Sequence, residues 1–382
     1  MLDALRGIGR DPRSGGYRRF AWTREDHDLR EWFDGEAAAR GLDVVTDRAG
    51  NGWAWWGDPA ADGPGVVTGS HLDSVPDGGA YDGPLGVVSA FHAVDALRAD
   101  GFTPARPIGI ACFGDEEGAR FGVACAGSRL LTGALDPERA AALVDGDGIA
   151  MGEAVARAGR APLGPDPDAL RRVGVFVELH VEQGRGLVDL GRPVAVGAAI
   201  HPHGRWRIDL AGRADHAGTT RLADRDDPML TLARVVLAAR AAAERHDALA
   251  TCGKVRVEPN GVNAVPSRVT AWLDARGADA GRVRAVVAEV AALAPVTEES
   301  WTDRTPFDPA LAARLSALLE DAPLLPTGAG HDAGVLAAAG VPTAMLYVRN
   351  PTGVSHSPAE RAPDEDCAAG VDALAAVLRE LA

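Results

Sequence analysis

The sequence predicts an α/β protein with a mainly parallel central sheet and a smaller α+β domain inserted into it. The length of 382 residues exceeds what one compact core usually holds. Short apolar runs separated by helical segments are typical of buried parallel strands. The pattern changes between about residues 204 and 302. We therefore expect a main domain in two parts, residues 1–203 and 303–382, with the inserted domain at 204–302.

Each apolar run of the main domain is followed at once by His, Asp or Glu. The runs are Gly65–Gly69, Ile108–Phe113, Val173–Val177 and Thr343–Val348. The segment Gly86–Ala99 between the first two is expected to be a helix. Ligands of open parallel sheets bind beyond the carboxyl ends of the strands. The polar residues after these runs are therefore expected to meet at one edge of the sheet.

The inserted domain is predicted as a small ferredoxin-like sandwich. Its expected elements alternate as strand, helix, strand, strand, helix and strand, an order typical of that fold. They are Arg205–Leu210, Met229–Arg245, Lys254–Glu258, Arg268–Ala275, Arg282–Leu293 and Val296–Trp301. The α/β pattern resumes after Phe307, so two crossings are expected, at Val194–His203 and Asp303–Pro309.

Composition narrows the classes of function. The chain has 54 acidic and 39 basic residues, a formal charge of −15, which argues against nucleic acid as a partner. No stretch approaches the ~20 apolar residues that span a bilayer, and the charged start does not form a secretory signal. We therefore expect a cytoplasmic protein without membrane partners. The scattered Cys112, Cys125, Cys252 and Cys367 are interpreted as structural thiols.

The residues after the apolar runs include donors for divalent metal ions. His71 and Asp73 lie two positions apart, so both side chains can point to the same side of a strand end. Histidines with carboxylates suit zinc, manganese, cobalt or nickel. The surplus of acidic residues indicates a pair of ions with a bridging carboxylate. One free carboxylate must then move the proton of water to the leaving nitrogen, and Glu116 is the candidate.

Each of these residues taken alone also has an ordinary explanation. His71 could be a core or loop histidine, and Asp82, before Gly-Pro, could cap its helix. The Glu-Glu pair could be a solvated turn, while His180 and His356 could cap a strand or lie on the surface. Their joint occurrence at successive strand ends favours the metal site.

At these positions the chain resembles the dinuclear aminoacylase/carboxypeptidase superfamily of zinc peptidases. Within it, the chain is similar to the branch of N-carbamoyl-L-amino acid hydrolases, β-ureidopropionases and allantoate amidohydrolases. The matching segments are GSHLDSVPDGGAYDGPLG, GDEEGARFG, ELHVEQG, GRADHAGTT, NGVNAVPSR, WLDAR, GAGHDAG and GVSHSPAE, in the family's order from residue 69 to 360. The resemblance implies a metallopeptidase-like catalytic domain with a lid and dimerisation domain, and a homodimer.

The resemblance also implies the metal ligands. It implies two divalent ions per subunit, zinc or manganese, with cobalt or nickel as alternatives. His71 and His180 would complete one site and Glu117 and His356 the other, with Asp82 bridging them. That set of ligands suits both a carboxylate bridge and neutral imidazole donors.

The same resemblance assigns further roles in the main domain. Glu116 would be the general base, and Asp73 would orient His71. Peptidase relatives carry a carboxylate at the position of His180, and Glu-Gln-Gly follows it here, which places the chain in the ureido branch. Gln183 and Gly353 would contact the substrate.

In the inserted domain, His216 resembles a histidine that reaches the partner subunit's site and stabilises the oxyanion. Asn263 and Arg276 resemble residues that hold the substrate carboxylate. Without the resemblance, His216 would be interpreted as a loop residue, and Arg276 as the ion-pair partner of Asp274. His331 would line the site.

The expected activity is hydrolysis of a linear, non-peptide C–N bond in an N-carbamoyl or ureido carboxylate, with allantoate as the first candidate. The sequence leaves two alternatives open. One is an N-acyl or N-formyl amino acid deacylase or dipeptidase. The other is a catalytically silent metal-binding scaffold, against which the intact Glu116 and ligand set argue.

Overall fold

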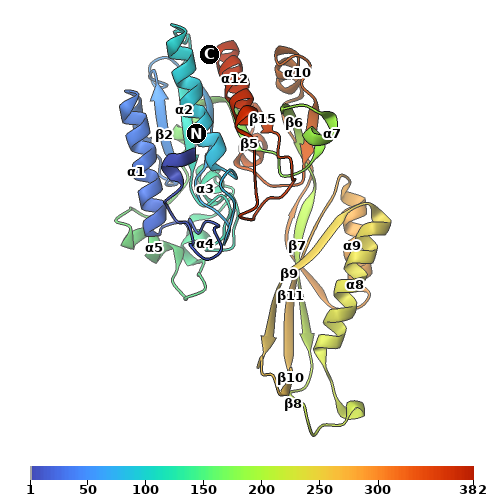
Figure 1. Ribbon diagram of the computed structural model, residues 1–382. Coiled ribbons are helices and arrows are strands. Elements are labelled where there is room, and N and C mark those ends of the chain that lie inside the picture. Colours follow the sequence, from blue (N-terminus) through green and yellow to red (C-terminus); the bar gives the residue numbers. More distant parts are fainter. Residues whose placement is uncertain (1) are drawn as a thin grey trace. The chain divides into compact units, whose positions relative to one another are not determined.

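The computed structural model describes residues 2–382. The chain divides into two compact units (Figure 1). The larger contains the residues up to Ala198 together with Pro306–Ala382, and the smaller is Ala199–Thr305. The smaller unit is thus a few residues longer at each end than the 204–302 expected for the insertion. None of the helices in residues 2–382 combines the length and apolar character needed to cross a membrane.

The larger unit is built on a sheet with the strand order β1-β2-β4-β3-β5-β15-β6-β13, with β14 beside β6. The strands are β1 (Asp43–Thr46), β2 (Gly52–Trp56), β3 (Gly65–His71), β4 (Ile108–Phe113), β5 (Val173–Val181), β6 (Val194–Ile200), β13 (Thr305–Pro306), β14 (Leu324–Thr327) and β15 (Thr343–Val348). The central strands β4, β3, β5 and β15 pair in parallel. Antiparallel pairs flank them. The mainly parallel sheet predicted from the apolar runs is confirmed.

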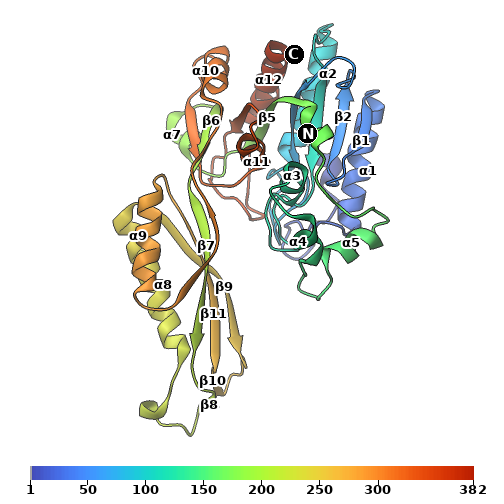
Figure 2. The ribbon, with the colours of Figure 1, turned by 180° about the vertical axis from the view of Figure 1, so that it is seen from behind.

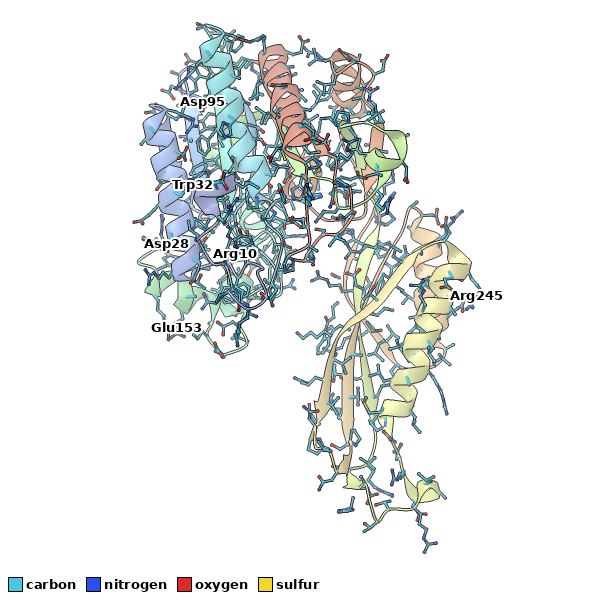
Figure 3. All side chains as sticks on the ribbon, in the orientation of Figure 1. Arg10, Asp28, Trp32, Asp95, Glu153 and Arg245 are labelled. Carbon is cyan, nitrogen blue, oxygen red and sulfur yellow. The ribbon has the colours of Figure 1, made fainter. Side chains whose placement is uncertain are left out.

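Helices cover this sheet. They are η1 (Leu2–Leu5), α1 (Arg24–Ala39), α2 (Pro84–Ala99), α3 (Ala126–Thr132), α4 (Pro137–Ala142), α5 (Met151–Arg157), α6 (Pro167–Arg171), α7 (Gly186–Leu190), α10 (Pro309–Leu318), α11 (Asp332–Ala338) and α12 (Asp364–Leu381). α1 is amphipathic, because Leu29 and Phe33 are buried while Asp28 points outward (Figure 3). α2 packs against β3 and α12 and is buried on most sides, so its sequence is almost entirely apolar.

Several strands extend beyond the ranges expected from the sequence. β3 continues past Gly69 to His71. β5 continues to Val181, so His180 lies within the strand and not after it. The expected first crossing, Val194–His203, is mostly strand β6. A Cβ added at Gly197 would lie 2.9 Å from the Met345 side chain. The glycine therefore lets β6 lie close to β15, and small residues that suggested a linker form a strand instead.

The smaller unit contains an antiparallel sheet of order β12-β7-β11-β9 and two helices that pack on each other and on the sheet (Figure 2). Its elements are β7 (His203–Ala211), β8 (Asp215–His216), η2 (Leu222–Asp224), α8 (Pro228–His246), β9 (Leu249–Glu258), β10 (Ala264–Val265), β11 (Arg268–Arg276), α9 (Ala280–Ala291) and β12 (Val296–Thr302). The predicted order of strands and helices is present, and its strand arrangement is that of a ferredoxin-like sandwich. The short β8–β10 pair was not expected.

Candidate metal centre

Two buried histidines lie side by side at the carboxyl ends of neighbouring parallel strands. His71 ends β3 and His180 lies near the end of β5, each 1% exposed. Their Nδ1 atoms lie 3.1 and 2.9 Å from the backbone oxygens of Asp73 and Val181, respectively. A carbonyl only accepts, so each Nδ1 carries a hydrogen, and each Nε2 is the nitrogen left to offer a lone pair to a metal ion. Neither Nε2 has a hydrogen-bond partner among the described residues.

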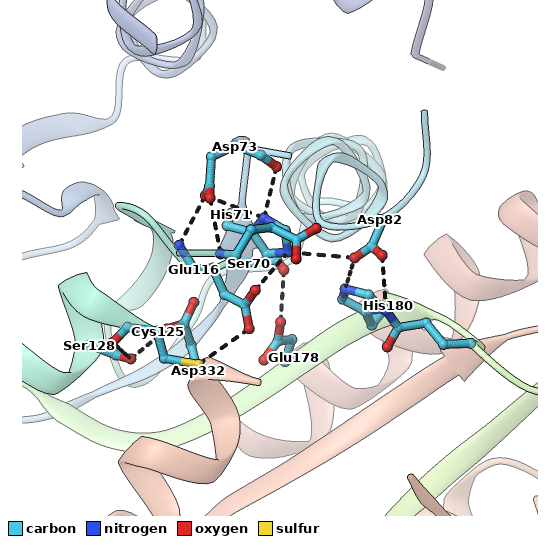
Figure 4. A network of polar contacts seen from close by, with 12 residues as sticks. Ser70, His71, Asp73, Asp82, Glu116, Cys125, Ser128, Glu178, His180 and Asp332 are labelled. Carbon is cyan, nitrogen blue, oxygen red and sulfur yellow. Dashed lines mark hydrogen bonds and ion pairs between the residues drawn. The ribbon is translucent and has the colours of Figure 1, made fainter. Parts of the chain in front are cut away.

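Asp82 lies opposite both lone pairs (Figure 4). Its Oδ1 is 3.2 Å from His180 Nε2 and 3.7 Å from His71 Nε2. The loop that carries Asp82 comes this close because Gly83 follows it. A Cβ at Gly83 would lie 2.4 Å from the His71 ring, and its φ of 85° also favours glycine. The first candidate ligand set is therefore His71, His180 and Asp82.

The second oxygen of Asp82 faces a second set. Oδ2 is 3.4 Å from His356 Nε2, which is itself 3.5 Å from Glu117 Oε2. These separations are close to the roughly 3.4 Å expected between two ligand atoms that each lie about 2.1 Å from one ion. The nitrogen and oxygen donors of Asp82, Glu117 and His356 therefore fit a divalent ion, as do those of the first set.

Three residues hold Asp82 in place, and two of them have no role in the sequence-based prediction. Gln183 Nε2 and Ser355 Oγ each donate to Asp82 Oδ2 at 2.9 Å. Glu360 accepts from the backbone N–H groups of Tyr81 and Asp82, at 2.8 and 3.0 Å. Ser355 and Glu360 flank His356 in the segment GVSHSPAE, and that proximity was the only signal in the sequence.

Asp73 connects the first set to the loop after β4. Its carboxylate accepts from the backbone N–H groups of Glu116 and Glu117, at 3.1 and 3.0 Å, and lies 3.4 Å from His71 Nδ1. Glu116 is buried, with its Oε2 3.8 Å from His71 Nε2. Burial, with the neighbouring carboxylates, raises the pKa of Glu116 well above its usual range, although His71 opposes the shift. A buried carboxylate thus stands beside the first ligand set.

The sequence profile of peptidase family M20/M25/M40 matches residues 67–380, which include all of these positions. The chain belongs to this family. The N-carbamoyl-L-amino acid amidohydrolase of Geobacillus stearothermophilus is 37% identical, with an alignment that covers 100% of this chain and 97% of that protein. The allantoate amidohydrolase of Escherichia coli (strain K12) is 33% identical, with an alignment that covers 100% of this chain and 96% of that protein.

Solved structures lead to the same family. An amidase of the hydantoinase/carbamoylase family from Burkholderia vietnamiensis superposes with a TM-score of 0.91 at 31% identity, covering 100% of this chain and 95% of that one. Full-length similarity at this level includes both units of the chain. Membership of the M20 family, together with the two clusters of donors, supports a divalent metal cofactor.

In this M20 member, His331 lies beside the candidate metal ligand His180. Its ring centroid is 4.5 Å from that of His180. Burial lowers the pKa of His331 well below its usual value, so the ring is neutral. The nearby Glu178 uses both carboxylate oxygens, accepting from Ser70 Oγ and from the Ala333 N–H. Glu178 and His331 therefore lie next to His180 and form part of the wall of the site.

The remaining predicted residues lie in two places. Gly353 has a φ of 66° in the loop that leads to His356, and the Arg185 side chain packs against it. In the smaller unit, His216 of β8 is paired with Ala264 of β10, and the Ala217 N–H donates to the backbone oxygen of Asn263. The structure therefore brings His216 and Asn263 together.

Arg276 lies at the other end of that unit's sheet. β8 follows the end of β7 that pairs with Arg268 of β11. Arg276 is eight residues further along β11 and pairs with His203, at the other end of β7. At ~3.3 Å per residue, Arg268 and Arg276 are about 26 Å apart. The Arg276 guanidinium binds the Asp274 carboxylate through two hydrogen bonds of 2.7 and 2.6 Å. The ion pair between Arg276 and Asp274 that the sequence suggested is thus present. Within one chain, Arg276 and His216 lie far apart.

Proposed function

We propose that this M20-family protein is a metal-dependent amidohydrolase that cleaves a linear C–N bond in an N-carbamoyl or ureido acid, with allantoate as the first candidate. The observation that carries the proposal is that the two oxygens of one carboxylate, that of Asp82, face different histidines. Asp82 turns Oδ1 to His71 and His180 and Oδ2 to His356. The names of the Geobacillus and Escherichia relatives support the class of substrate.

The proposed cofactor is a pair of zinc or manganese ions, both of which Asp82 would help to hold. His71 and His180 would complete one coordination shell, and Glu117 and His356 the other. Two ions so placed would polarise the scissile carbonyl and ease deprotonation of the attacking water. The hydrogen bonds from Gln183 and Ser355 to Asp82 would fix the bridge.

Glu116 would act as general base. Its Oε2 accepts a proton from the attacking water as the water oxygen bonds to the carbamoyl carbon, and the acid then protonates the leaving nitrogen as the C–N bond breaks. The products of the first step are ammonia and a carbamic acid, which loses carbon dioxide to give the free amine. Asp73 holds the backbone of Glu116 during both transfers.

Ammonia release tests this function. The enzyme loaded with Mn²⁺ or Zn²⁺ is expected to release one ammonia per turnover from allantoate or from an N-carbamoyl-L-amino acid, because both carry a terminal ureido nitrogen. N-formyl-L-glutamate and a dipeptide serve as controls, since their hydrolysis yields an amino acid and no ammonia. Turnover confined to the controls would assign the chain to the deacylases or dipeptidases instead.

A homodimer would complete the site. His216 and Asn263 lie about 26 Å or more from Arg276 in one chain, so all three can contact one small carboxylate only if two chains supply them. The smaller unit also exposes apolar side chains on α8 and on the edge strand β9. Leu230, Leu237 and Leu249 are 61%, 72% and 65% exposed. We propose that two copies associate through this unit.

Mixing two inactive variants tests the homodimer. A dimer of one His216→Ala chain and one Glu116→Gln chain retains a single complete site, because the second chain supplies its histidine to the first. Random reassembly of a 1:1 mixture is therefore expected to restore about one quarter of the wild-type activity. A mixture no more active than its components, or a monomer by light scattering, would contradict the shared site.

A further inference from the structure

A buried thiol lies against the carboxylate that we assign as the base. Cys125 is 3% exposed, and its Sγ lies 3.3 Å from Glu116 Oε1 (Figure 4). Burial raises the pKa of this thiol well above its usual value, so it keeps its hydrogen and donates. The interpretation of Cys125 as a structural thiol does not account for this contact between its Sγ and the Glu116 carboxylate.

The backbone fixes the thiol in this position. Cys125 has a φ of 54°, in the left-handed region, immediately before α3. Its N–H donates to the backbone oxygen of Glu116, and the next N–H, of Ala126, donates to that of Asp115 at 3.0 Å. A Cβ at Gly127 would lie 2.6 Å from the backbone oxygen of Gly114, so the start of α3 packs tightly on the loop after β4. Neither segment can move away from the other without breaking these contacts.

The two oxygens of Glu116 therefore have different surroundings. Oε1 meets the thiol, and Oε2 lies 3.8 Å from His71 Nε2. A thiol is a weak donor, so it can orient a carboxylate with little loss of basicity, whereas a strong donor would stabilise the charged form. We propose that Cys125 is a positioning residue that holds Oε1 of Glu116 and leaves Oε2 to take the proton. This proposal rests on the base role of Glu116.

Two substitutions at Cys125 and one control test the proposal in the metal-loaded enzyme. Cys125→Ala removes the donor, and Cys125→Ser keeps a donor on a shorter bond. Cys367→Ala, in α12, removes an equally buried thiol far along the chain from Glu116. For allantoate, or the N-carbamoyl-L-amino acid that is turned over, kcat is expected to fall about tenfold in the alanine variant and about threefold in the serine variant. KM, metal content and the control variant's kcat are expected to stay unchanged.

The same substitutions in a Glu116→Gln background separate positioning from packing. If Cys125 acts through the carboxylate, neither substitution lowers the residual kcat of that background further. Equal losses in both backgrounds, loss of metal, or a wild-type kcat for Cys125→Ala would overturn the proposal. If Cys125→Ala does not fold, the serine variant in the two backgrounds decides in the same way. Near-normal kcat for Glu116→Gln alone would overturn the base role, and this proposal with it.

Discussion

Asp82→Asn is expected to lower the bound metal from about two ions per chain to one or fewer and to reduce hydrolysis at least ~1,000-fold. Asparagine keeps the shape of Asp82 but offers one acceptor oxygen and an NH2 group, whose nitrogen lone pair is delocalised and does not bind a metal ion. The two oxygens of Asp82 face different histidines. In the variant, the NH2 group must therefore take the place of a ligand oxygen in one of the two ligand sets. Elemental analysis after dialysis and an ammonia assay measure the two effects.

His27→Ala provides the matched control. His27 belongs to another group of metal-ligand side chains, with Asp28 and Glu31, but that group lies on the exposed surface of α1. Its substitution is expected to leave metal content and kcat unchanged. If the asparagine variant kept two ions per chain, Asp82 could not be the bridge, and its contacts with the three histidines would have to be plain ion pairs.

Glu116→Gln is expected to keep the metal and lose about 100- to 10,000-fold in kcat, with little change in KM. The amide cannot accept the proton of the attacking water, while Glu116 itself belongs to neither ligand set. Single-turnover measurements on the metal-loaded variant would show whether the loss lies in the chemical step.

The neighbouring glutamate is the control for this prediction. Glu117 lies in the same loop, but its Oε2 is 3.5 Å from His356 Nε2. Glu117→Gln is therefore expected to weaken metal binding, and added metal should restore part of its activity. If Glu116→Gln lost its metal as well, or turned over at a near-normal rate, the two glutamates would not have the separate roles proposed for them.

Much of the fold could be predicted because the central strands are buried on both faces. Such strands consist of continuous apolar residues, and β4 and β15 have exactly the bounds that their apolar runs predicted. β5 was predicted too short because Glu178 and His180 are polar. These side chains are buried only because Ser70, Ala333 and Asp82 contact them, and no pattern within β5 contains those partners.

The same reason limits the prediction of the site. A ligand that follows a strand is visible from its position. Ser355, Glu360 and Cys125 instead matter through hydrogen bonds with residues elsewhere in the chain: Ser355 with the Asp82 side chain, Glu360 with the Tyr81 and Asp82 backbone, and Cys125 with the Glu116 side chain. Nor does the sequence reveal that Arg276 and His216 lie at opposite ends of the smaller unit. That separation depends on how β7 and β11 are paired, which the residues of either strand alone do not determine.

The contact between Glu360 and the backbone of Tyr81 and Asp82 joins residues almost 280 positions apart. Until synthesis has passed residue 356, a nascent chain has Asp82 and both buried histidines, but neither His356 nor the Glu360 that holds the loop of Asp82. The proposed pair of metal ions can therefore bind in full only after these late residues have been added. A chain truncated before residue 356 would be left with a partial, weakly held site, so metal content can serve as a measure of correctly finished molecules.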